Sequence, residues 1–147
     1  MKTLLALLLM STAVVAQSQA GGQDKPLTDA EKQSVLSVRF VRAKLNDPES
    51  FRFSSVIAHL IDRKDGSSAY AVCIDGSIHN PTRGLTPLVS YVLPPYQNDP
   101  MTALMGSSDT GSADGGTNIE VYNAMCKNKK GENTTNTVRR ALRTQPQ

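Results

Sequence analysis

The spacing of hydrophobic residues changes along this chain, and the first pattern is an apolar run at its start. Residues 4–10 are all apolar and follow Lys2, and small residues come next. This arrangement is typical of a secretory signal peptide, with cleavage after Ala16 or Ala20, and the run is too short for a stable membrane span. We therefore expect residues 1–20 to be removed and the mature protein to be periplasmic or secreted.

Apolar residues at helical spacing predict an N-terminal helix after residue 28. Thr28 and Glu31 have the spacing of a capping box, in which each side chain satisfies a backbone N–H at the helix start. Pro48 comes three residues after Leu45, the last apolar residue of this pattern, and disfavours helical geometry at Asp47. The helix should therefore end before Pro48. The predicted buried stripe comprises Val35, Val38, Val41 and Leu45.

Alternating apolar and polar residues then predict a three-stranded antiparallel meander. The strands are expected over residues 51–61, 68–78 and 85–93. Asp65-Gly66 is a strong signal for a tight hairpin turn between the first two strands. Ser54-Ser55 interrupts the alternation and predicts a bulge, while Pro87 implies either an edge position or an early irregularity in the third strand. The expected core residues of the second strand are Tyr70, Val72, Ile74 and Ile78.

The rest of the chain gives weaker patterns. Residues 96–118 are rich in Gly, Ser, Asp and Pro and are expected to form a loop, whereas residues 118–126 fit either a strand or a short helix. We therefore predict one α+β domain over residues 21–126, with the N-terminal helix packed on a small antiparallel three-stranded meander. Residues 127–147 are predicted to be a basic C-terminal tail, disordered or forming at most a weak helix.

Cysteine content and charge refine this picture. Cys73 and Cys126 are the only cysteines, and in an oxidising compartment they are expected to form one disulfide that ties the C-terminal segment to the sheet. The tail holds six basic residues and one acidic residue, whereas residues 21–126 hold nine basic and twelve acidic ones. The tail is therefore either a solvated end or a segment that contacts anionic surfaces.

The sequence contains few motifs that indicate a catalytic activity or a bound metal or cofactor. The chain has no Walker loop, dinucleotide fingerprint or His-Glu-x-x-His motif, and two cysteines with only His59 and His79 make a poor zinc site, so we predict no cofactor and no metal. The triplet Asp109-Thr110-Gly111 matches aspartic proteases but lacks the apolar strand that such a site needs. His59 is expected on a solvent or interface face. The absence of Trp and the few aromatics argue against nucleic-acid binding.

The loop after the second strand is the strongest candidate site, because loops on a rigid sheet often carry function. Its candidate binding residues are Asp75, His79, Asn80 and Arg83. We assign no catalytic residues, although His79 and Asp75 together with Ser77 could be assembled into a hydrolytic arrangement if the geometry allowed it.

Two segments resemble a group of small exported bacterial proteins. Residues 45–53 are similar to its Leu-x-Asp-Pro-x-Ser-x-x-Phe segment, and the chain from Cys73 through Asn80 to Gly84 is similar to its second segment. Ile74 stands where that group has a glycine after the cysteine. The group is largely uncharacterised, so the resemblance implies an exported domain and supplies no mechanism.

Three functional hypotheses follow. The first is a non-enzymatic binding or accessory module of the cell envelope with a protein partner. The second is a secreted inhibitor or immunity-type protein, in which a disulfide-braced loop blocks a partner enzyme. The third is a small envelope hydrolase that uses residues 75–83.

Overall fold

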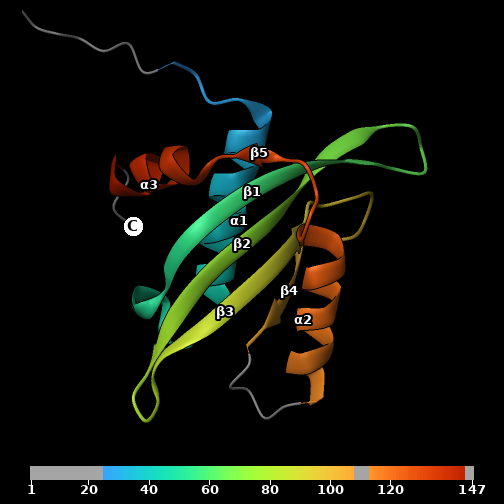
Figure 1. The fold of residues 1–147 in the computed structure, drawn as a ribbon. Coiled ribbons are helices and arrows are strands. Elements are labelled where there is room, and N and C mark those ends of the chain that lie inside the picture. The colour runs from blue at the N-terminus through green and yellow to red at the C-terminus, as the bar shows by residue number, and fades with distance from the viewer. Residues whose placement is uncertain (1–24, 108–112, 145–147) are drawn as a thin grey trace, which may run out of the picture.

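The fold is an α+β sandwich in which helices cover both faces of one antiparallel sheet (Figure 1). The computed structural model describes residues 25–107 and 113–144, so the expected signal peptide and the triplet at 109–111 lie outside the described residues. The elements are α1 (Asp29–Lys44), η1 (Pro48–Ser50), β1 (Arg52–Asp62), β2 (Ser68–Asn80), β3 (Gly84–Leu93), β4 (Thr102–Gly106), α2 (Ala113–Cys126), β5 (Glu132–Asn133) and α3 (Thr135–Thr144).

Helix α1 begins as the sequence predicts. The Thr28 backbone N–H donates to the Glu31 carboxylate at 2.8 Å, and the Glu31 N–H donates to the Thr28 hydroxyl at 3.2 Å. These two bonds complete the capping box and satisfy donors that have no partner within the helix. The helix ends at Lys44, and Pro48 starts the short η1 turn.

The predicted meander is present, and its local features are confirmed. Its strands β1, β2 and β3 pair antiparallel in chain order. Gly66 has a φ of 82° in the first hairpin turn, and the register of β1 shifts between Phe53 and Ser55, where a bulge was expected. Strand β3 is not an edge strand, because β4 pairs with it from Val89 onward, but Pro87 lies before that pairing and has only β2 beside it.

The prediction of a three-stranded sheet was incomplete. The sheet has five strands in the order β4-β3-β2-β1-β5, so the meander gains one short strand on each side. Strand β4 lies inside residues 96–118, which were expected to be a loop, and its five residues are too few to give a clear alternation. Residues 118–126, for which the sequence fits either a strand or a short helix, belong to helix α2.

The main core lies between the sheet and the helices α1 and α3. Its fully buried side chains come from alternate positions of β1, β2 and β3 and from one stripe of α1. Of the four expected core residues of β2, Val72 and Ile74 are fully buried, whereas Tyr70 and Ile78 are only half-buried because they lie toward the two ends of the strand. The α1 members of this core include Val35, Val38 and Val41.

A second, smaller core lies on the opposite face, beneath α2. Residues of β2 and β3 with the opposite orientation meet α2 here, and its buried members are Ala71, Cys73, Tyr91 and Tyr122. The central strands are therefore covered on both faces, which explains why β2 reads as a nearly continuous buried run from Ala71 to Ile74.

The basic tail is part of the domain, so the boundary expected at residue 126 is not where the packing ends. Val138 is fully buried in the main core, and Thr134 donates to the Ser34 hydroxyl of α1 at 2.8 Å. The backbone N–H of Val56 in β1 donates to the Thr135 hydroxyl at 2.8 Å. Strand β5 and α3 thus close the sheet edge and cover α1. No helix within the described ranges is long and apolar enough to cross a membrane.

Candidate functional site

The disulfide expected from the sequence is present. Cys73 and Cys126 are bonded with their Cα atoms 5.8 Å apart, and the bond joins the middle of β2 to the last residue of α2. It lies in the smaller core beneath α2. The bond therefore holds α2 against the sheet and braces the strand that carries the candidate binding residues.

Asp75, the first of these residues, is engaged with α2. The Tyr122 hydroxyl donates to the Asp75 carboxylate at 2.7 Å. Burial, together with the hydrogen bond to Asp75, raises the pKa of Tyr122 well above its usual value, so the phenol stays protonated and keeps donating. The carboxylate acts here as an attachment point for α2.

The other three candidates lie together at the tip of the β2–β3 hairpin. His79 is exposed and pairs with Leu85 across the hairpin. The Asn80 side-chain oxygen accepts from the Thr82 backbone at 2.9 Å and from its hydroxyl at 2.8 Å, which fixes the turn. Because Asp75 is four residues from His79 along a strand, their Cα atoms are about 13 Å apart. The structure thus separates Asp75 from the other three.

A cavity of about 430 Å³ lies beside this tip, and we call it the hairpin pocket. One wall is the segment after α1, which includes Asp47 and Ser50, and the other is the end of β2 with His79 and Asn80. Ser50 uses its hydroxyl to donate to the Asp47 backbone oxygen at 2.8 Å. The pocket therefore combines two segments that are about thirty residues apart in the chain.

His59 lies elsewhere than the sequence predicts. It was expected on a solvent or interface face, but its exposure is only 6% and its Nδ1 lies 3.0 Å from the Lys130 backbone oxygen. The segment leading into β5 covers it, and the alternation of β1 alone could not show this covering. Within the described ranges, no three His, Cys, Asp or Glu side chains are close enough to hold a metal ion.

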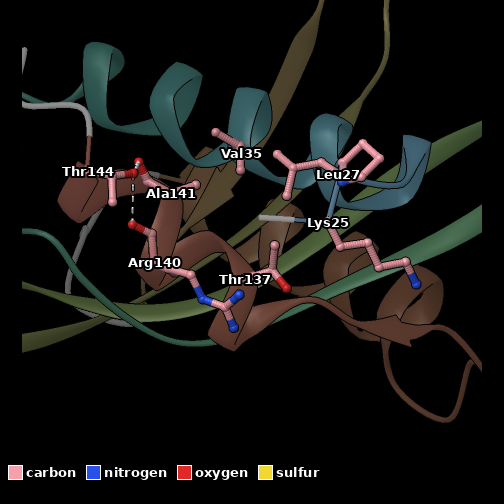
Figure 2. A pocket seen from close by; sticks show the side chains of 8 residues that line it. Lys25, Leu27, Val35, Thr137, Arg140, Ala141 and Thr144 are labelled. Atoms are coloured by element: carbon pink, nitrogen blue, oxygen red, sulfur yellow. Dashed lines mark hydrogen bonds between the residues drawn. The ribbon is translucent and has the colours of Figure 1, made fainter. Parts of the chain in front are cut away.

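Further cavities adjoin α3, and the sequence did not predict them. One, of about 320 Å³, lies between α3 and the segment that leads into α1 (Figure 2). Leu27, Val35 and Ala141 supply its apolar part, while Lys25 and Arg140 supply positive charge. Another is lined by four arginines and lies at the opposite side of α3. The only sequence signal for it was the basic composition of the tail.

No family model, no curated protein and no solved structure matches this chain.

Proposed function

We propose that this chain is an exported, non-enzymatic binding or accessory module of the cell envelope that contacts a protein partner through the tip of the β2–β3 hairpin. The observation that carries the proposal is the exposure of this tip. Leu85 is 71% exposed beside the exposed His79, on a hairpin that extends past the end of α1 (Figure 1). A hairpin whose turn is already fixed loses little conformational freedom on binding, which suits it to contact a partner through such a side chain.

Export is supported by the apolar N-terminal run and fits the disulfide, because disulfides persist in oxidising compartments. The resemblance to exported bacterial proteins adds to this. Both segments on which the resemblance rests, near Asp47 and near Asn80, line the hairpin pocket. The pocket and the tip are therefore one continuous candidate surface.

The geometry favours binding over hydrolysis. A hydrolytic arrangement of His79 with Asp75 needs the carboxylate within hydrogen-bond reach of the imidazole. Asp75 instead accepts a hydrogen bond from Tyr122 beneath α2. The Asn80 side chain is likewise used to fix its own turn.

The inhibitor or immunity-type function remains the second candidate, and the same hairpin favours it. The Cys73–Cys126 bond braces β2, and the Asn80 turn fixes the tip, so little conformational freedom would be lost on binding. In this case the partner would be an enzyme whose active site receives the tip.

An affinity pull-down of the mature protein from envelope extract tests the proposal. The test variant is Leu85→Ser, and Leu60→Ser is the matched control because Leu60 is 61% exposed near the opposite hairpin. We expect one stoichiometric protein to be retained by the wild type and by Leu60→Ser and to be lost with Leu85→Ser. Equal retention by all three forms, or retention of no protein, would contradict the proposal.

Two further measurements separate the alternatives. Inhibition of an enzyme isolated in the pull-down, relieved in Leu85→Ser, would select the inhibitor function. Ester or amide hydrolysis by the purified protein that disappears in His79→Ala would instead select the hydrolase.

A further inference from the structure

A groove of about 390 Å³ lies where the end of α1, the start of β1 and one face of α3 meet, and we call it the arginine groove. Four arginines from these three elements line it. Arg42 comes from the last turn of α1, Arg52 is the first residue of β1, and Arg139 and Arg143 are one helical turn apart on α3. The tertiary fold therefore concentrates positive charge that the sequence distributes over about one hundred residues.

This charge is not neutralised within the described residues. Glu49 is the one carboxylate that lines the groove, and no ion pair within 4.0 Å joins any of the four arginines to an acidic side chain in the part of the chain that the structure describes. The Nε of Arg42 is buried and has no hydrogen-bond partner. The four guanidinium groups therefore form a cluster of positive charge without a bonded counter-charge, so the groove is well suited to an added anion.

Two of the arginines are held in position by the backbone beside the groove. Arg52 donates to the Phe51 backbone oxygen at 3.0 Å and also to that of Glu49. Arg139 donates to backbone oxygens of β1 at 3.4 and 3.5 Å and lies over the Phe53 ring at 5.7 Å. Each uses a single terminal nitrogen for these bonds, so both keep further N–H groups for a ligand.

The N–H donors of the four arginines indicate which class of ligand suits the groove. Guanidinium groups present paired N–H donors that match the oxygens of phosphate, and several of them together favour a multiply charged group over a single carboxylate. The volume suits a small molecule, and Phe53 and Leu142 supply an apolar side for the group that carries the anion. A second cavity on the surface of α3, lined by Arg139, Arg140 and Arg143, extends the positive surface.

We propose that the arginine groove is a binding site for a phosphate-bearing ligand. The phosphate is either part of a soluble small molecule or part of a lipid headgroup, and the contacts are the same in both cases. The arginine groove and the hairpin pocket share no lining residue, so the phosphate proposal does not depend on the proposed protein partner.

Calorimetric titration of the mature protein with inorganic phosphate and with glycerol phosphate tests the soluble source. Co-sedimentation with phosphatidylglycerol vesicles, compared with phosphatidylcholine vesicles, tests the headgroup source. Arg143→Gln is the test variant because Arg143 is exposed, and Lys64→Gln is the control because Lys64 is an exposed cation in the β1–β2 turn. We expect the affinity for the bound probe to fall about tenfold or more in Arg143→Gln and to stay unchanged in Lys64→Gln.

Arg42→Gln supplies an independent readout. A structural arginine would lower the thermal midpoint when replaced, whereas this variant removes a half-buried cation whose Nε has no hydrogen-bond partner. We expect Arg42→Gln to weaken binding of the probe while the thermal midpoint of the free protein stays the same or rises. Absence of binding to all of the probes, or equal loss of affinity in Arg143→Gln and Lys64→Gln, would overturn the proposal.

Discussion

Removal of the disulfide tests how the sheet and α2 are held together. Cys73 and Cys126 are separated by 53 residues, and in the chain-entropy model a loop of this size stabilises the folded state by about 4 kcal/mol. The double variant Cys73→Ala/Cys126→Ala should therefore shift the folding equilibrium about a thousandfold toward the unfolded state. With a urea dependence of roughly 2 kcal/mol per M, the unfolding midpoint should fall by about 2 M.

The assay is urea unfolding of the mature protein followed by far-UV circular dichroism. Alanine is chosen over serine because Cys73 lies in an apolar cluster, where a hydroxyl would add a polar group without a partner. Wild-type protein in excess reductant is the control, since it loses the covalent bond but keeps both side chains. A loss below about 1 kcal/mol in both samples would refute the reasoning, because it would show that α2 constrains the chain by packing alone.

Three further predictions concern the C-terminal segment and its contacts. Val138→Ala should lower the free energy of unfolding by about 2–3 kcal/mol in urea titrations, whereas a tail outside the core would give no change. Gly131→Ala should destabilise the protein by roughly 1–3 kcal/mol, because an added Cβ would lie 2.7 Å from a backbone oxygen of β1, while Gly116→Ala, with open space around it, should not destabilise it. The hydrogen bond from the Thr28 backbone N–H holds the pKa of Glu31 below its usual 4.5. The ionised carboxylate therefore stabilises the fold above about pH 4.5, and this stabilisation is lost as the pH falls through the folded-state pKa. The difference in thermal midpoint between wild type and Glu31→Gln should accordingly shrink as the pH is lowered below 4.5.

The local elements of the N-terminal half could be predicted from the sequence because their signals are short-range. The Thr28–Glu31 capping box, the turn at Asp65-Gly66 and the bulge near Ser54 each depend on residues within a few positions of one another. Periodicity likewise identified Val38 and Val72 as core residues. The cysteine pair followed from counting, since only one pairing of two cysteines exists.

The candidate site could be predicted only in part. His79, Asn80 and Arg83 share one turn, so sequence proximity was sufficient to group them. Asp75 was grouped with them on the same basis, but it lies four residues before His79 along β2, where α2 covers the strand and Tyr122 binds the carboxylate. A β-strand rises about 3.3 Å per residue, so a side chain four positions away is too far to contact the residues at the tip.

By itself, the sequence determined the class of the domain, the start of α1, the hairpins and the disulfide partners, because these depend on neighbouring residues or on a single possible pairing. Only the tertiary structure decided that the basic tail belongs to the core. Val138 and Thr134 contact α1 and β1 across roughly eighty to one hundred residues, and no local pattern encodes such a contact. The same long-range packing brings Arg42 and Arg143 to the lining of one cavity and so creates the arginine groove. Sites made by distant segments depend on the packing of the whole chain, which one-dimensional periodicity does not contain.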